Sequence, residues 1–222
     1  MGLGNPSHGK ERYSLQYDGL IFDLDGTLWD ACEAVACSWT CTLRDVYGVA
    51  NPPSIGEIQS IMGLQSHEIA QRLFARYGAD PDEMAARCMR EECAYLEAHG
   101  AHLYQDVPAT LQRLAEAYPL SIVSNCQKGY IESFLRFYHL ESLFVDFECE
   151  GGTGLPKPDN IRLVMARNGL RRPAYIGDTQ GDFEAAARAG AAFIWAAYGF
   201  GQAPQAPLRI GCFRDLLTLV KK

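Results

Sequence analysis

The segment GLIFDLDGT, residues 19–27, joins a short apolar run to two closely spaced carboxylates. The apolar part, residues 19–24, has the length and composition of a buried strand. Asp23 and Asp25 stand at its end, and Asp25-Gly26 forms a natural exit turn. A turn there would bring the second carboxylate over the first. We therefore predict a buried strand that delivers both carboxylates to its carboxyl end.

Downstream of residue 105, short apolar runs alternate with amphipathic segments. This rhythm is typical of an α/β fold built on a parallel sheet. Gly169 is well placed to end one of the helices. In such sheets ligands bind at the carboxyl ends of the strands. The expected strands are 120–123, 144–147, 174–176 and 191–195, and the expected helices are 107–118, 131–138, 161–168, 183–189 and 213–220.

Between these parts, residues 30–99 carry helical periodicity and no strand signal. Two apolar stripes mark helices, and 82–98 is a further helical segment. We expect an α/β core from residues 17–29 and 102–222, an inserted helical cap domain over 30–101, and an N-terminal leader, 1–16, without stable order. Residues 28–31 and 99–104 would be the hinges. The stripes are Val35, Trp39, Leu43 and Val46, then Ile69, Leu73 and Tyr77.

The composition of the 222-residue chain narrows the class of protein. Hydrophobic residues make up 48% and charged residues 21%, which excludes a mainly disordered chain. The net charge of −7 disfavours a basic nucleic-acid surface. Neither a membrane-spanning segment nor a secretory signal is evident. The eight cysteines form no C-x-x-C pair. We expect a cytoplasmic protein with reduced thiols, a monomer or homodimer without nucleic-acid or membrane partners.

Polar residues follow the other expected strands as well. Ser124 and Asn125 follow one strand, Lys157 follows the loop after the next, and Asp178 and Asp182 follow a third. Gathered at one edge of the sheet, the carboxylates would repel one another unless a cation lay among them. Oxygen ligands suit Mg²⁺, while the lysine, hydroxyl and amide suit a phosphate. The pattern predicts phosphoryl transfer.

The order of these motifs resembles the haloacid dehalogenase superfamily, specifically its phosphatases. DLDGT is followed by SN, a lysine and GD-x-x-x-D, and residues 182–190 resemble that family's D-x-x-x-A-x-x-A-G. The helical insert resembles the C1-type cap of phosphoglycolate phosphatase-like members. The resemblance implies a Rossmann-like core with helices on both faces and a phosphatase acting on a small phosphorylated metabolite. The second carboxylate, Asp25, argues against a dehalogenase.

The resemblance also implies a role for each motif residue. Asp23 would be the nucleophile that forms an aspartyl-phosphate, and Asp25 the general acid and base. Mg²⁺ would be held by Asp23, the backbone carbonyl of Asp25 and Asp178, with Asp182 behind them as support for the metal site or the lysine. Thr27 would also support Asp25. Lys157 would be catalytic, and the phosphate would be bound by Gly26, Thr27, Ser124, Asn125 and Lys157.

Substrate selection is the least determined point. The loop over residues 62–67 would dip toward the site, with Gln65 and His67 as substrate contacts and Gln127 and Lys128 as weaker candidates. Alternatively, Ser66 caps the following helix and His67 faces solvent. The family pattern K-P-x-P lacks its second proline here, which leaves the shape of that loop open.

Other functions stay open at this stage. A phosphomutase of the β-phosphoglucomutase type and a non-catalytic phosphate-binding protein are the alternatives. A phosphonate hydrolase would need a lysine in the cap, and residues 30–100 contain none. The cap also lacks a cluster of arginine or lysine, which favours a small, modestly charged organic phosphate over a nucleotide or polyphosphate.

Overall fold

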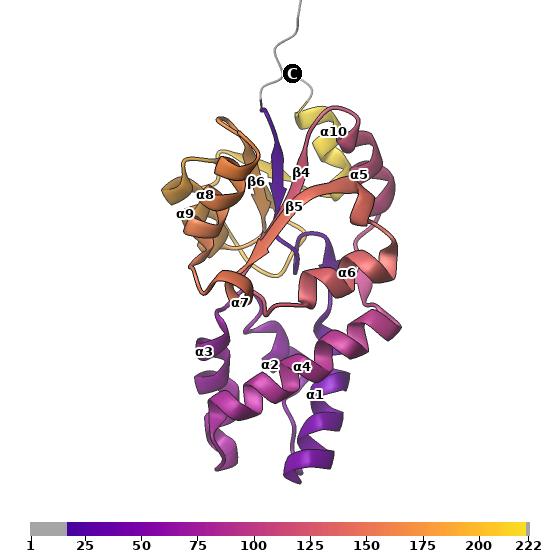
Figure 1. Cartoon of the computed structure of the whole chain (residues 1–222), viewed down its shortest axis with the longest axis vertical. Helices are drawn as coiled ribbons and strands as arrows, with labels where there is room; N and C mark the ends of the chain where they lie inside the picture. The colour runs from indigo at the N-terminus through magenta and orange to yellow at the C-terminus, as the bar shows by residue number, and fades with distance from the viewer. Residues whose placement is uncertain (1–16, 221–222) are drawn as a thin grey trace, which may run out of the picture.

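A six-stranded sheet forms the centre of the computed structural model, which describes residues 17–220. The strands run in the order β5-β4-β1-β6-β7-β8, and every neighbouring pair is parallel. β1 lies inside the sheet, and later strands are added on both of its sides (Figure 1). The order in which strands are added therefore reverses at β1, while all strands stay parallel. The strands are β1 Leu20–Phe22, β4 Leu120–Ser124, β5 Phe144–Cys149, β6 Ala174–Gly177, β7 Ala192–Ala196 and β8 Leu208–Ile210.

Helices cover both faces of the sheet because the central strand is apolar on both sides. Leu20 and Phe22 point into a core shared with α5 and α10, whereas Ile21 points into a second core formed with α8 and α9. Figure 1 shows these two helix pairs on opposite sides of the strands. The predicted α/β fold is therefore confirmed. The helices of the sheet domain are α5 Val107–Ala115, α6 Tyr130–Tyr138, α8 Lys157–Arg167, α9 Gln180–Ala189 and α10 Leu216–Leu219, and α7 Glu150–Thr153 is a single short turn.

The helical insert leaves and rejoins the sheet domain through two short paired strands. β2 Trp29–Asp30 and β3 His102–Leu103 pair antiparallel, at the places where hinges are expected. Figure 1 shows the insert as a separate layer beneath the sheet, and the Asn125 side chain, directly after β4, bonds to its backbone at Gly63. Its elements are α1 Cys32–Tyr47, α2 Ile55–Gln59, α3 Ser66–Ile69, a π-helical turn η1 Ala70–Phe74, a 3₁₀ turn η2 Ala75–Tyr77 and α4 Pro81–His99.

Several predicted elements differ from the observed ones at their ends. α8 begins at Lys157, four residues before the prediction, because Pro158 is compatible with a first helical turn that needs no N–H donor. Strand β8 was not predicted. Val46 is 50% exposed, so the buried stripe of α1 ends at Leu43. The expected helix over 213–220 is a 3₁₀ turn, η4 Phe213–Asp215, followed by α10, and a similar turn, η3 Glu141–Leu143, precedes β5.

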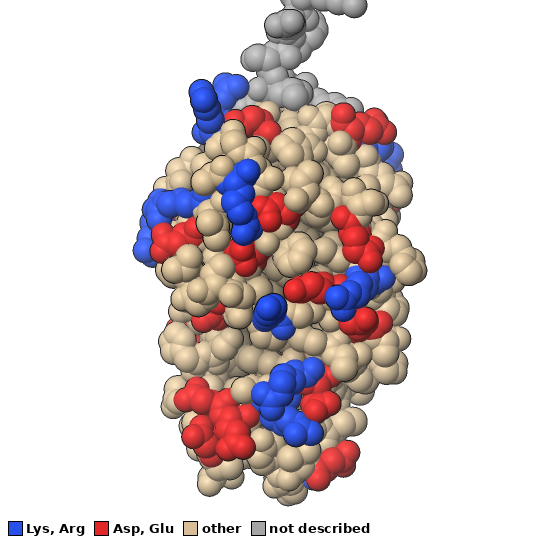
Figure 2. All heavy atoms as spheres, in the orientation of Figure 1, with Lys and Arg blue, Asp and Glu red and all other residues tan. Residues whose placement is uncertain are grey.

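The surface carries charges of both signs. Figure 2 shows one face on which most Lys and Arg side chains stand beside acidic ones. Within residues 17–220, no helix combines the length and the apolar character that crossing a membrane requires. The expected leader, residues 1–16, lies outside the described residues.

Candidate active site

Three carboxylates and one ammonium group meet at the carboxyl end of the sheet. Asp23 follows β1, Asp178 follows β6, Asp182 lies in the first turn of α9, and Lys157 begins α8. Lys157 Nζ lies 2.6 Å from Asp182 Oδ1 and 3.1 Å from Asp23 Oδ1. All four residues are buried, and oxygens of the three carboxylates lie within 4.8 Å of one another. The structure thus brings together residues that are up to 159 positions apart in the chain.

Burial and mutual repulsion raise the pKa values of these acids. Burial, together with the charge of Asp182, raises the pKa of Asp23 to about 6, although Lys157 opposes the shift. Burial and the charges of Asp182 and Asp23 raise the pKa of Asp178 to about 8. Burial disfavours the charged form of Lys157, but Asp182 and Asp23 outweigh that effect and raise its pKa well above the ordinary value. One ammonium faces three carboxylates, so the site lacks positive charge.

The unpartnered oxygens indicate which carboxylates suit a metal ion. Asp182 is fully engaged, since Oδ1 accepts from Lys157 and Oδ2 accepts from the backbone N–H and hydroxyl of Thr179. Asp178 Oδ2 accepts from the backbone of residues 200 and 201, but its Oδ1 is buried without a hydrogen bond. Asp23 Oδ1 also accepts no hydrogen bond, despite its closeness to Lys157. Two free, buried carboxylate oxygens in an electronegative site fit Mg²⁺.

Asp25 occupies a different environment from Asp23. Its side chain does not belong to the acidic cluster, and Oδ1 accepts a 2.8 Å hydrogen bond from the Tyr130 hydroxyl. Burial raises the pKa of Asp25 to about 8, an effect that the Tyr130 bond opposes. Sequence reasoning missed Tyr130, whose position carries no motif. Thr27, expected to support Asp25, is buried, and its hydroxyl makes no hydrogen bond.

Gly26 lets the loop after β1 pass close to Asp178. Its φ of +74° disfavours other residues, and a Cβ atom there would lie 2.3 Å from Asp178 Oδ2. The Gly26 N–H donates to the backbone oxygen of Trp29 at 2.9 Å. The geometry thus accounts for this glycine through the turn itself, and its contact with phosphate stays a prediction.

A small cavity separates Asp25 from the helical insert. We call it the leaving-group cavity; its volume is about 40 Å³. Its core side includes Asp25, Asn125, Gln127 and Tyr130. Asn125 Nδ2 donates to the backbone oxygen of Gly63, at 3.0 Å, while Asn125 Oδ1 has no partner. Ser124 is buried at the end of β4, as expected. The SN motif therefore sits where core and insert meet.

The loop expected to select the substrate does approach this cavity, but through other residues. Met62, Gly63 and Leu64 line the leaving-group cavity, and Gln65 and His67 do not. Gln65 is the residue preceding α3, so it takes the helix-start position expected for Ser66. His67 instead lines an outer cleft together with Lys128. Of the four candidates, only Gln127 lines the leaving-group cavity.

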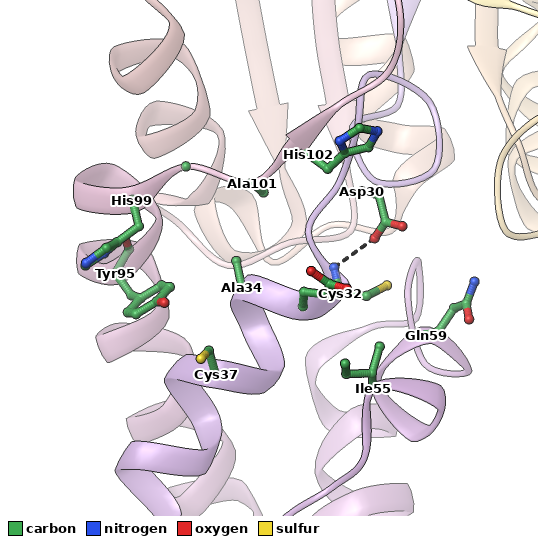
Figure 3. A pocket seen from close by; sticks show the side chains of 12 residues that line it. Asp30, Cys32, Ala34, Cys37, Ile55, Gln59, Tyr95, His99, Ala101 and His102 are labelled. Atoms are coloured by element: carbon green, nitrogen blue, oxygen red, sulfur yellow. Dashed lines mark hydrogen bonds between the residues drawn. The ribbon is translucent and has the colours of Figure 1, made fainter.

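A larger cavity lies at the hinge. Its volume is about 600 Å³, and residues from both hinge segments line it, including Asp30 and His102 (Figure 3). Asp30 Oδ1 accepts a hydrogen bond from the backbone of Cys32 there, at 2.9 Å. None of Asp23, Asp178 and Asp182 lines this cavity, so the acidic cluster lies elsewhere.

Comparison with known proteins identifies the family. Residues 20–196 match the model of the haloacid dehalogenase-like hydrolases. The chain belongs to this family. A phosphoglycolate phosphatase of Rhodobacter capsulatus is 32% identical over 193 residues, covering 83% of this chain and 86% of the relative. One from Aliivibrio fischeri is 27% identical, covering 82% and 84%.

Solved structures of the family share the fold. A predicted phosphoglycolate phosphatase from Haemophilus somnus aligns with a TM-score of 0.75 and 24% identity, covering 92% of this chain and 98% of that one. CbbY from Rhodobacter sphaeroides, in complex with phosphate, aligns with a TM-score of 0.77 and 18% identity, covering 93% and 100%. The predicted family, fold and enzyme class, a phosphatase of the haloacid dehalogenase superfamily, are thus confirmed.

Proposed function

We propose that this hydrolase cleaves a small organic phosphomonoester, with Mg²⁺ as cofactor and an aspartyl-phosphate on Asp23 as intermediate. One observation carries the proposal: the buried Asp23 carboxylate has an oxygen, Oδ1, that accepts no hydrogen bond and lies 3.1 Å from Lys157 Nζ, with Asp178 beside it. A carboxylate is a workable nucleophile toward phosphorus when its surroundings offset its charge. The similarity to curated phosphoglycolate phosphatases supports hydrolysis over a phosphomutase or a phosphate-binding protein.

Asp23, Asp178 and the backbone carbonyl of Asp25 are the residues that would hold Mg²⁺. When bound, the ion would neutralise carboxylate charge and polarise the phosphoryl oxygens. Lys157 would contact the same oxygens with its ammonium group. Asp182 holds that group in place through its 2.6 Å contact. Ser124 and Asn125 would add neutral hydrogen bonds to the phosphate.

The two aspartates of the DLDGT segment would then divide the chemistry. An Asp23 oxygen bonds to phosphorus as the bond to the leaving oxygen breaks, and Asp25 gives that oxygen a proton. Water then attacks the phosphorus and passes a proton to Asp25, which releases phosphate and restores Asp23. Burial keeps the pKa of Asp25 at about 8, so its proton is available at neutral pH.

The insert would act as a cap domain over residues 30–101. The paired strands β2 and β3 mark its two junctions with the core, 17–29 and 102–222. In the described state it closes over the site, with Asn125 bonded to Gly63 and Gln127 bonded to Glu92. Such closure would exclude water before phosphoryl transfer. All eight thiols are unpaired, which fits a reducing compartment such as the cytoplasm.

The test is phosphate release from p-nitrophenyl phosphate and from a panel of small phosphomonoesters by wild type and Asp23→Asn, each with Mg²⁺ or with EDTA. We expect Mg²⁺-dependent turnover that falls at least about a thousandfold in Asp23→Asn. Asp159→Asn, which alters a surface ion pair with Arg162, is the matched control and should retain turnover. A folded wild type without turnover, or an active Asp23→Asn, would refute the proposal.

A further inference from the structure

The leaving-group cavity has an unusual balance of charge for a site that receives an anion. Its walls from the insert are mainly apolar: Val35, Ile61, Met62, Leu64, Ile69 and Met89. The core contributes the amides Asn125 and Gln127 and the hydroxyl of Tyr130. Among the described residues that line it, none is Lys, Arg or His. Lys157 is already paired with Asp182 and Asp23 at the phosphate end.

One further carboxylate faces this cavity from the insert. Glu92, in α4, is only 3% exposed and lines the cavity with Asp25. It accepts hydrogen bonds from the indole N–H of Trp39 and from Gln127 Nε2, the latter at 3.0 Å. No ion pair engages Glu92 within residues 17–220. Neutral donors therefore hold a buried acid beside the place where the leaving group would lie.

This arrangement penalises a negatively charged leaving group. A carboxylate placed there would lose its water shell and gain no cationic partner, and the carboxylate of Glu92 would stand beside it. A hydroxyl or ammonium group would instead donate a hydrogen bond to a carboxylate that has spare acceptor capacity. The volume of about 40 Å³ holds about three water molecules, which matches a leaving group of two or three carbons.

We propose that Glu92 makes the enzyme select phosphomonoesters whose small leaving group carries a hydrogen-bond donor and no negative charge. This inference rests on the proposed function and specifies its substrate class. It also separates the chain from the phosphoglycolate phosphatases to which it is similar, because glycolate is a carboxylate. Glu92 is then a specificity residue that contacts the leaving group.

Three substrates with the same two-carbon skeleton test the proposal. Phosphoglycolate, 2-hydroxyethyl phosphate and 2-aminoethyl phosphate differ at the far end, which is a carboxylate, a hydroxyl or an ammonium. We expect kcat/KM of wild type to be at least about tenfold higher for the hydroxyl and ammonium esters, the lower end of the discrimination that one hydrogen bond to a charged group provides. Phosphoglycolate as the best of the three would overturn the inference, whatever happens to variants.

Glu92→Gln removes the charge and keeps the side-chain shape. The amide oxygen can still accept the hydrogen bond from the Trp39 indole N–H, so this contact is kept in the variant. We expect the preference over phosphoglycolate to shrink at least about fivefold, mainly through KM. Glu91→Gln, at the exposed neighbouring position of α4, should keep the wild-type ratio. Equal changes for all three esters in Glu92→Gln would contradict a role in selection.

The two proposals can fail separately. Absence of Mg²⁺-dependent phosphate release from p-nitrophenyl phosphate and from all three esters in folded wild type would refute the proposed function, and the substrate class with it. Turnover of p-nitrophenyl phosphate with phosphoglycolate preferred would refute only the substrate class. Turnover with the expected order of esters would support both.

Discussion

The two ends of the site are built on opposite principles. At the phosphate end, Asp23, Asp178, Asp182 and Lys157 place four ionisable groups in a buried cluster. At the leaving-group end, apolar side chains of the insert surround Glu92 and two amides, and no cation is among the described lining residues. The first end suits one chemical group, the phosphoryl group. The second takes its apolar wall and Glu92 from the inserted helical segment, whereas Asp25, Asn125, Gln127 and Tyr130 of the core complete it.

The largest effect should come from the charge cluster. Lys157→Met leaves Asp23 and Asp182 buried without their ammonium partner. We expect the free energy of unfolding at pH 8 to fall by about 3–5 kcal/mol and the deficit to shrink on acidification, as the carboxylates take up protons. Urea denaturation of both proteins over a pH series measures this. Lys128→Met, at an exposed lysine, should change stability by less than about 0.5 kcal/mol. If Lys157→Met and Lys128→Met lowered the unfolding free energy equally, the buried charge cluster would have no special weight in stability and the account of it would be refuted.

A smaller effect should mark the leaving-group end. Burial raises the pKa of Glu92 from 4.5 to about 7, although hydrogen bonds from Gln127 and Trp39 oppose the shift. The folded state therefore binds this proton more tightly than the unfolded state. The resulting stability is fully present below pH 4.5 and is lost as the pH rises through about 7.

Glu92→Gln isolates this contribution. Between pH 4.5 and 7, wild type should lose up to about 3 kcal/mol of unfolding free energy relative to the variant. Denaturant melts at several pH values measure the difference, and Glu91→Gln should follow wild type throughout. Parallel stability curves for wild type and Glu92→Gln would show that Glu92 does not titrate in this range.

The smallest effect should come from an exposed ion pair between the core and the inserted helical segment. Arg136, in α6, pairs with Glu97, in α4, at 3.0 Å, but both side chains are about half exposed. We expect Arg136→Met to lower the unfolding free energy by less than about 1 kcal/mol and to leave kcat/KM within about twofold. Thermal melts and steady-state assays check both. A loss comparable to that of Lys157→Met would contradict the ranking of the buried charge cluster above this exposed ion pair.

The same contrast separates what the sequence could predict from what it could not. The charged end follows from local signals, because each residue stands in the segment that follows a strand, and parallel strands end at one edge of the sheet. Asp23, Asp178, Asp182 and Lys157 meet as expected. The beginning of α8 at Lys157 was missed because its apolar periodicity starts only at Ile161.

At the other end the sequence carries no comparable signal. Glu92 stands in a charged stretch, MREE, and only the packing of α4 against α1 and the core buries it. Tyr130 likewise meets Asp25 from 105 residues away. Gln65 and His67 were reasonable candidates by loop position, but the turn before α3 presents Met62, Gly63 and Leu64 to the cavity. Such contacts depend on tertiary packing, which residue types and spacing do not determine.

The most direct test of the account is to look for the phosphoryl group on Asp23. Wild type and Asp23→Asn would be mixed with Mg²⁺ and p-nitrophenyl phosphate, quenched in acid during turnover, and digested for mass spectrometry. The account predicts the mass of one added phosphoryl group on the wild-type peptide containing Asp23, and none on that of the variant. Turnover by wild type with the phosphoryl group on another residue, or by Asp23→Asn at the wild-type rate, would contradict it.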